Sequence, residues 1–437
     1  MSHDLSYLKG FGNHFESEAL PNSLPEIGNN PQKCPRGLYA EQLSGTSFLA
    51  PSDENLKTWL YKIRPSVSHS PYKPYQLPTF QSSGKEDVNC PPDQLRWDPM
   101  PDVKGSKNFI ESLFTVCTTG DFHSRSGCAV HLYSTDKSME NECFYNADGE
   151  FLIVPQMGSL LIQTELGYLD LSPNEIAVVP RGIKFRVELK DGQAAGYICE
   201  NYGQPLTLPY RGPIGANGLA NERDFLTPVA HFEESSDPYK VIAKFEGNLW
   251  ETTYKGSVFD TVAWHGNYAP YKYDLGMFNT INTVSFDHPD PSIFTVLTSP
   301  SLKEGTSNID FVIFPPRWMV ATNTFRPPYY HRNFMSEYMG LIHGVYDAKP
   351  KGGGFSPGSG SLHNCMTAHG PDSKAFEAAS NADLKPEYIK DTMAFMFETS
   401  TVLKPTKQAL ECSFLQKNYI DESWGSLKPA GPLDRSK

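Results

Sequence analysis

The sequence predicts a mainly β protein, and three observations indicate it: abundant proline and glycine, short apolar runs, and few helical patterns. Of the 437 residues, 36 are proline and 34 glycine, and proline is well above its average usage of roughly 5%. These residues end helices and form the turns between short strands. Hydrophobic residues make up 39% of the chain, which is enough for a sizeable core.

The expected strands fall into two groups. The first 110 residues are rich in turns and prolines. Within them, apolar and polar residues alternate in part at 59–64, which predicts one clear strand. The first group, typical of a small antiparallel barrel, covers residues 151–154, 159–163, 169–171, 176–179 and 185–189. Beyond a glycine-rich loop, the second group covers residues 292–298, 311–314 and 393–397. We expect two domains, 1–279 and 280–437, with short helices only near 372–380 and 415–424.

Composition excludes several classes of protein. A formal net charge of −12 and a pI near 5.5 argue against a nucleic-acid or anionic-membrane partner. Residues 1–9 lack the plan of a signal peptide, and no apolar run approaches the roughly 20 residues that span a bilayer. The eight cysteines are scattered without a C-x-x-C pair, which is typical of free thiols in a reducing compartment. We therefore expect a cytoplasmic protein with a small-molecule partner.

The segment with the most chemistry is residues 325–344, which contains His331 and Glu337. In a helix these two residues would lie about 9 Å apart along the axis on opposite faces. In a straight strand they would share a face but lie about 20 Å apart. They can share a metal only if the chain bends or reverses between Asn333 and Ser336, as it does at the mouth of a β-barrel. Without such a bend, the pair is most simply an ordinary surface or core pair.

This spacing resembles that of the cupin family. The first cupin motif reads G-x5-H-x-H-x3-4-E-x6-G, and the sequence places His331, Asn333, Glu337 and Gly344 at its last four specified positions. Phe325 stands in place of the opening glycine. The resemblance implies a mainly β, two-domain cupin or jelly-roll barrel architecture.

A further histidine would complete a 2-His-1-carboxylate triad, which holds Fe(II) on one face and leaves adjacent positions open. Two histidines follow within 40 residues. His363 lies where the second cupin motif would place its histidine, and His369 lies on a loop punctuated by glycine and proline. Spacing alone does not choose between them.

In the first half of the chain, residues 174–185 resemble the second cupin motif, P-x-G-x2-H, with Phe185 in the histidine position. This half is therefore expected to be a barrel without metal ligands. A plain Pro-Gly turn between two strands explains the same residues equally well.

Longer blocks of the sequence resemble the homogentisate 1,2-dioxygenase family over nearly the whole chain. They are GFGN at 10–13, LYAEQLSG at 38–45, RPSVSH at 64–69, QLRW at 94–97, GPIGANGLAN at 212–221, VAWHGNY at 262–268, DPSIFTVL at 290–297, FVIFPPRW at 311–318 and FRPPYYHRN at 325–333. The resemblance implies an Fe(II) enzyme of tyrosine and phenylalanine breakdown that converts homogentisate and O2 to 4-maleylacetoacetate. It also implies a hexamer built from two trimers.

The resemblance further implies roles for individual residues. The block MTAHGPD at 366–372 makes His369 the third metal ligand, beside His331 and Glu337, and leaves His363 as a pocket residue. His288, in FDHPDP at 286–291, matches the proton acceptor, and Tyr346 matches a tyrosine that contacts substrate.

Strand alternation supplements these assignments. Asn333 lies two residues from His331 and should point into the barrel, so we place it at the substrate together with Tyr346, His363 and His369. By the same alternation Arg332 should point away from the metal, and we do not assign it to the substrate carboxylate. The loop at 349–360 is about two residues longer than the family pattern, and such an insertion costs little.

Two other functions fit parts of this pattern. A different metal-dependent cupin enzyme, such as an isomerase or hydrolase, would more often keep four ligands. A storage or binding protein of the cupin family would lack the His–Glu pair. Measurements of oxygen uptake with homogentisate and of iron binding distinguish these two functions from that of a ring-cleaving dioxygenase.

Overall fold

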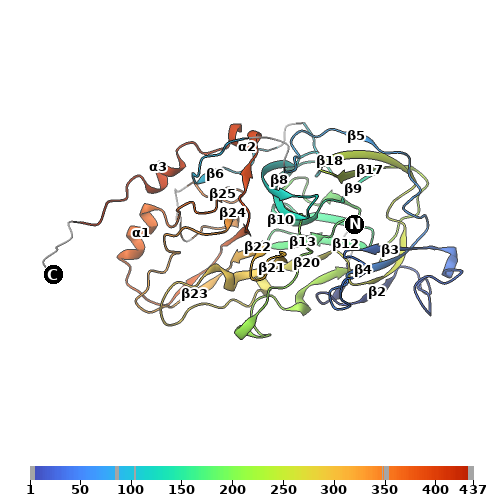
Figure 1. Ribbon diagram of the computed structural model, residues 1–437, viewed down its shortest axis with the longest axis horizontal. Coiled ribbons are helices and arrows are strands. Elements are labelled where there is room, and N and C mark those ends of the chain that lie inside the picture. The colour runs from blue at the N-terminus through green and yellow to red at the C-terminus, as the bar shows by residue number, and fades with distance from the viewer. Residues whose placement is uncertain (1–4, 84–87, 103–104, 347, 349–353, 432–437) are drawn as a thin grey trace.

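The computed structural model describes residues 5–83, 88–102, 105–346, 348 and 354–431 (Figure 1). The start of the N-terminal segment, residues 1–4, and part of the 349–360 loop, residues 349–353, lie outside the described residues. Strands dominate, and the described α-helices are short: α1 (Ser373–Ser380), α2 (Lys407–Glu411) and α3 (Tyr419–Trp424). The predicted mainly β fold with few short helices is confirmed. Asp372 caps α1 by accepting a hydrogen bond from the Ala375 backbone N–H.

Two facing sheets form the first barrel. One sheet has the order β1 (Tyr7–Lys9), β16 (Leu226–Pro228), β20 (Tyr271–Asp274), β13 (Glu175–Val179), β10 (Glu150–Met157), β15 (Ala194–Asn201), β8 (Ser126–Thr135), β7 (Phe114–Asp121) and β28 (Lys404–Pro405). The other has the order β12 (Gly167–Leu171), β11 (Leu160–Thr164), β14 (Phe185–Leu189), β9 (Glu142–Asn146), β17 (Pro238–Phe245), β18 (Asn248–Lys255) and β5 (Lys73–Tyr75). Buried aromatic and aliphatic side chains, Phe144, Phe151 and Phe185 among them, fill the space between these sheets.

The second half is built around one larger sheet. Its order is β21 (Thr295–Pro300), β22 (Ser307–Phe314), β27 (Met393–Thr399), β24 (Ser336–His343), β25 (Gly360–His363) and β6 (Leu95–Trp97). A smaller pair joins β23 (Arg317–Met319) to β26 (Glu387–Ile389). A separate four-stranded sheet at the N-terminal end has the order β2 (Phe15–Glu18), β19 (Thr261–Gly266), β4 (Lys57–Lys62) and β3 (Tyr39–Ser44). Short 3-10 turns cover Pro35–Gly37, Gly212–Ile214, Glu222–Asp224, Leu275–Met277 and Pro291–Phe294.

The two halves repeat one strand order. In the first half β13-β10-β15-β8-β7 lie side by side, and in the second half β25-β24-β27-β22-β21 do so. The halves lie end to end in the view of Figure 1, the first on the right and the second on the left. They also exchange edge strands, because β6 pairs with β25 and β28 pairs with β7. One hydrophobic core cluster contains residues of both halves, including Leu152, Tyr197 and Phe395.

No helix among the described residues is long and apolar enough to cross a membrane. All eight cysteines are free, as their scattered positions predicted.

Candidate metal and substrate site

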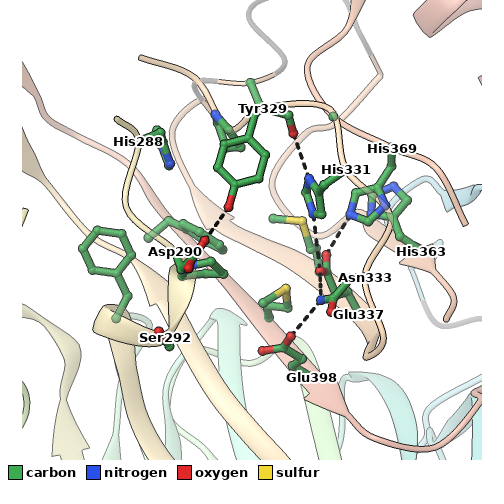
Figure 2. Close-up of a pocket in the computed structure, with 18 of the residues that line it drawn as sticks. His288, Asp290, Ser292, Tyr329, His331, Asn333, Glu337, His363, His369 and Glu398 are labelled. Carbon is green, nitrogen blue, oxygen red and sulfur yellow. Dashed lines mark hydrogen bonds and ion pairs between the residues drawn. The ribbon is translucent and has the colours of Figure 1, made fainter. Parts of the chain in front are cut away.

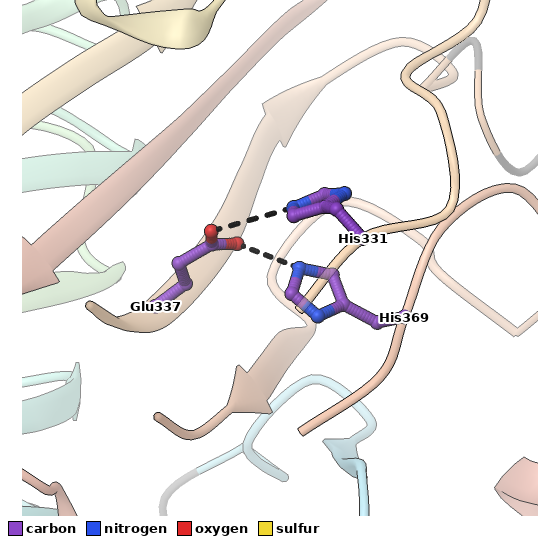
Figure 3. Close-up of side chains that lie close together, drawn as sticks. All are labelled: His331, Glu337 and His369. Carbon is purple, nitrogen blue, oxygen red and sulfur yellow. Dashed lines mark hydrogen bonds and ion pairs between the residues drawn. The ribbon is translucent and has the colours of Figure 1, made fainter. Parts of the chain in front are cut away.

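The structure brings together three side chains that the sequence analysis had singled out (Figure 3). His331 and His369 lie on irregular segments that meet in an isolated antiparallel bridge. The backbone N–H of each histidine donates to the carbonyl of the other, at 2.9 and 3.0 Å. This reciprocal pair of bonds holds the two imidazoles on the same side of the barrel, with ring centroids 4.2 Å apart.

Glu337 approaches both histidines from β24, whose first residues follow the bend predicted between residues 333 and 336. Its Oε2 lies 3.1 Å from His369 Nε2, and its Oε1 lies 3.7 Å from His331 Nε2. One potential ligand atom from each of the three residues lies within 4.8 Å of the other two. The side chains therefore converge on one point, as a shared metal ion requires.

The electrostatics of the three residues also suit a metal. Burial alone would raise the pKa of Glu337, but hydrogen bonds with His331 and His369 hold it at about 2. The carboxylate is thus ionised at neutral pH. Burial alone would lower the pKa of His331, but hydrogen bonding to Glu337 and to the Tyr329 carbonyl raises it overall. A cation at this point would replace the proton that these groups now share.

The backbone fixes which nitrogen of each histidine faces the site. His331 Nδ1 lies 2.8 Å from the Tyr329 carbonyl oxygen, and His369 Nδ1 lies 2.8 Å from the Thr367 carbonyl oxygen. Because a carbonyl only accepts hydrogen bonds, Nδ1 must be the protonated nitrogen in both rings. Each Nε2 therefore faces Glu337, and its lone pair would be available to a metal ion once the proton shared with the carboxylate is displaced.

These residues line a cavity of about 430 Å³ (Figure 2), a size suited to a small molecule. His288, Tyr346 and His363 also line it, so every residue predicted for the site lies at this cavity. Arg332 contributes to the lining as well. Residues 332–335 form no regular strand, so alternation does not determine which way the Arg332 side chain points.

Asn333 points into the cavity as predicted and connects two carboxylates. Its Nδ2 donates to Glu337 Oε1 at 2.8 Å and to Glu398 Oε1 at 3.0 Å. Its Oδ1 accepts from the Met335 backbone N–H, which closes the bend before β24. Asn333 therefore orients Glu337 from the side opposite His369.

Glu398 was missed by the sequence analysis. It lies on β27 directly opposite Glu337, so both side chains point to the same face of the sheet. Burial and the charge of Glu337 raise the pKa of Glu398 to about 7. The sequence did offer one signal for Glu398, because it is the single carboxylate in the largely apolar run MAFMFET at 393–399.

His288 lies on the far side of Tyr329 from His331 (Figure 2). The ring centroids of His288 and Tyr329 are 6.3 Å apart, and those of Tyr329 and His331 are 5.6 Å apart. The Tyr329 hydroxyl donates to Asp290, which fixes this ring in the cavity wall. Sequence analysis had given Tyr329 and Asp290 no role.

His363 lies directly opposite Glu337 on β25 and stacks on His369, with ring centroids 4.3 Å apart and planes 13° from parallel. Tyr346 is largely buried and packs edge-on against Phe314 and Phe355. Both residues line the cavity without belonging to the three-residue cluster.

Two sequence models of one family together match nearly the whole chain. Homogentisate 1,2-dioxygenase N-terminal matches residues 6–275, and Homogentisate 1,2-dioxygenase C-terminal matches residues 276–430. This chain belongs to the homogentisate 1,2-dioxygenase family. It is a ring-cleaving oxidoreductase that acts on homogentisate, and the storage-protein and isomerase alternatives are set aside. Homogentisate 1,2-dioxygenases are metal-dependent cupin enzymes, in keeping with the cluster of His331, Glu337 and His369.

This member of the homogentisate 1,2-dioxygenase family is also distantly similar to several solved structures. Protein Ylba from E. coli is 9% identical, with 73% of this chain and 95% of that chain covered and a TM-score of 0.30. A mutant of oxalate decarboxylase OxdC from Bacillus subtilis is 11% identical, with 77% and 84% covered and a TM-score of 0.32. A Cupin 2 conserved barrel domain protein from Leptotrichia buccalis is 8% identical, with 68% and 91% covered and a TM-score of 0.28. Similarities this weak add nothing on substrate or metal.

Proposed function

We propose that His331, Glu337 and His369 hold one Fe(II) and that the cavity beside them binds homogentisate for ring cleavage by O2. The observation that carries this proposal is the convergence of two Nε2 atoms and one carboxylate within 4.8 Å. The donor set is that of a 2-His-1-carboxylate site, which favours Fe(II) in oxygenases. The protonated Nδ1 atoms and the ionised Glu337 support it, because a metal needs these protonation states.

Iron supplies the chemistry that side chains cannot. Reaction of an aromatic ring with O2 is spin-forbidden, and an iron ion held by His331, Glu337 and His369 would supply the one-electron chemistry that lifts this restriction. The product is 4-maleylacetoacetate, with both oxygen atoms incorporated, as in tyrosine and phenylalanine breakdown.

The surrounding side chains bind and orient the substrate. Tyr346 and His363 line the cavity, His363 from β25. Asn333 lies between Glu337 and Glu398. We assign Tyr346, His363, His369 and Asn333 to substrate contact. Pro289, Pro291, Phe294 and Phe314 in the lining exclude water from the aromatic ring.

His288 takes the proton from the substrate hydroxyl. Its Nδ1 lies 2.9 Å from the Pro289 carbonyl oxygen, so Nδ1 is the donor and Nε2 is the accepting nitrogen. A neutral imidazole is a suitable base near neutral pH. Removing this proton leaves an electron-rich phenolate, which is the form that gives electrons to O2.

Assembly and location complete the proposal. We propose a homohexamer of two trimers in the cytoplasm, with the free cysteines in keeping with a reducing compartment.

The proposal is tested by loading the protein anaerobically with Fe(II), adding homogentisate, and following O2 consumption and product absorbance. His288→Asn should keep its iron and its fold but lose turnover by about 10²- to 10⁴-fold, the scale for losing a general base. Higher pH should partly restore the rate, because solvent then deprotonates the phenol. A near-normal rate in His288→Asn would show that the proton leaves by another route.

A further inference from the structure

A buried polar cluster behind the cavity joins three distant parts of the chain. Arg96 comes from β6, Ser361 and His363 come from β25, and Tyr419 comes from α3. Arg96 and Tyr419 are 1% and 3% exposed. Arg96 pairs with Ser361 across the two strands, and its Nε donates to Ser361 Oγ at 3.0 Å. Its Nη2 donates to Tyr419 Oη, also at 3.0 Å.

Aromatic rings hold the Arg96 guanidinium in place. Its central carbon lies 4.1 Å from the Tyr419 ring centroid and 4.8 Å from the Phe355 ring centroid, both within the range of cation–π attraction. Burial lowers the pKa of Arg96, yet a guanidinium stays protonated in proteins. Burial raises the pKa of Tyr419 to about 12, so its hydroxyl keeps its proton at neutral pH.

A chain of hydrogen bonds links Arg96 to His363. Arginine only donates, so Tyr419 Oη accepts from Arg96. The same oxygen lies 3.3 Å from His363 Nε2, within hydrogen-bond distance. Whichever of these two atoms donates, the bond ties the His363 ring to Tyr419.

We propose that Arg96 and Tyr419 are positioning residues that fix the ring plane of His363 in the substrate cavity. His363 stacks on His369 at 4.3 Å and lies opposite Glu337, so a turn of its ring would disturb the wall of the cavity beside the metal ligands. The inference rests on the proposed substrate role of His363. It assigns a function to β6 and α3, from which no described residue lines the cavity.

The first test is Tyr419→Phe, which removes the hydroxyl and keeps the ring that stacks on Arg96. Iron content should be unchanged. We expect kcat to fall about 10-fold, the scale of losing one hydrogen bond, with little change in KM for homogentisate. Tyr338→Phe is the matched control, because the buried Tyr338 hydroxyl on neighbouring β24 has no hydrogen-bond partner among the described residues. It should leave kcat and iron content unchanged.

A double-mutant cycle with His363→Ala separates positioning from a general effect on the fold. If Tyr419 acts through His363, then Tyr419→Phe should add no further loss once His363 is alanine. Independent losses that multiply, or loss of iron in Tyr419→Phe, would overturn the inference. Normal turnover in His363→Ala would instead contradict the proposed substrate role of His363, so the two failures are distinguishable.

Variants of Arg96 test whether its hydrogen bond holds Tyr419 in place. Arg96→Met removes every donor and should lower kcat at least as much as Tyr419→Phe, while Arg96→Lys keeps a donating cation and should restore part of the rate. Urea unfolding and iron analysis of each variant identify any that fail to fold. Equal rates for the folded Met and Lys variants would show that Arg96 only fills space.

Discussion

The two halves of the chain place the same strands in the same order around different side chains. In the second half, Glu337 on β24 lies opposite Glu398 on β27 and His363 on β25. In the first half, Phe151 on β10 lies opposite Glu200 on β15 and Val179 on β13. The register of one sheet can therefore be transferred residue by residue to the other.

At the matching positions of the first half, a phenylalanine stands in place of each proposed ligand. Phe144 and Phe185 lie opposite each other, as His331 and His369 do. Phe151 takes the place of Glu337. The three phenylalanine rings pack against one another with centroids 5.6 to 6.3 Å apart. One barrel thus gathers three aromatic rings where the other gathers two imidazoles and a carboxylate.

The supporting residues are retained in both halves. Asn146 stands two residues after Phe144, as Asn333 stands two residues after His331. The Asn146 Nδ2 donates to Glu200 at 2.6 Å, and its Oδ1 accepts from the backbone N–H of Asp148. Gly158 and Gly344, seven residues after Phe151 and Glu337, both have positive φ, 71° and 81°.

The carboxylates Glu200 and Glu398 occupy matching positions in opposite charge environments. Burial alone would raise the pKa of Glu200, but the Lys244 ammonium and a hydrogen bond with His131 hold it at about 2. Glu398 instead faces Glu337, and its pKa is raised to about 7. The first barrel thus contains its own cation in the form of Lys244. The shared sheet positions the side chains in both halves, and only their chemistry separates the phenylalanine-filled barrel from the proposed metal site.

The largest expected difference between the halves is in iron binding. His369→Ala should lose nearly all bound iron and all turnover, because it removes one of the three proposed ligands, and Glu337→Gln should do the same by removing the only anionic one of these three. The matched variant Phe185→Ala should keep one iron per chain and instead lose about 3–5 kcal/mol of stability from the cavity it creates. Metal analysis of iron-loaded protein and urea unfolding measure both. A reproducible two irons per wild-type chain would contradict the comparison.

The next largest effect concerns the matched carboxylates. Glu200→Gln should cost about 3–5 kcal/mol, because it leaves the buried Lys244 without its main counter-charge. Asp148 Oδ2, 3.3 Å from Lys244 Nζ, offsets part of this loss. Glu398→Gln should instead raise stability at neutral pH, since an amide cannot take on the charge that burial and Glu337 disfavour. Denaturant unfolding of the iron-free variants compares them, and equal losses would contradict the assigned charge states.

The same two residues predict opposite pH dependences for iron-free protein. The pKa of Glu200 is depressed from 4.5 to about 2, so its contribution is fully present above pH 4.5 and is lost as pH falls toward 2. The pKa of Glu398 is raised from 4.5 to about 7, so its contribution is present below pH 4.5 and is lost as pH rises through 7. Glu200→Gln should therefore flatten the stability profile between about pH 2 and 4.5, and Glu398→Gln should flatten it between about pH 4.5 and 7. Over each of these pH ranges, the free energy of unfolding of the wild type should change by at most a few kcal/mol through the carboxylate concerned.

Local patterns in the sequence predicted the mainly β class and one consecutive run of strands. Short apolar runs between turns matched β10, β11, β12, β13 and β14, because an alternating or fully buried strand is visible within a few residues. The pairings of β6 with β25 and of β28 with β7 could not be predicted. Each joins segments more than 250 residues apart, and a strand of two or three residues carries no signal of its partner.

The part of the site that lies within a sequence motif was predictable. The spacing of His331, Asn333 and Glu337 identified the bend and the inward side chains. It did not choose between His363 and His369, because both lie beside Glu337, one across the sheet and one on a returning loop. The choice of His369 remains a proposal, now supported by its place in the three-residue cluster.

Residues that act through tertiary contacts were missed. Phe144 and Phe151 are ordinary core residues in sequence, and only the matched register shows that they occupy ligand positions. Arg96 and Tyr419 are 323 residues apart and meet only in the fold.

The smallest expected effect comes from the two matching asparagines. Asn146→Ala removes one bond to Glu200 and the acceptor for the bend, which should cost about 1–3 kcal/mol of stability and leave iron binding unchanged. Asn333→Ala removes the corresponding bonds, so its cost in stability should be similar. Because Asn333 also orients Glu337, its loss should weaken iron affinity by about 10- to 100-fold, the usual effect of removing a residue that supports a ligand. Urea unfolding of the iron-free proteins and competition with an iron chelator measure the two quantities separately. Equal iron affinity in the two variants would show that Asn333 closes the bend, as Asn146 does, without holding the carboxylate for the metal.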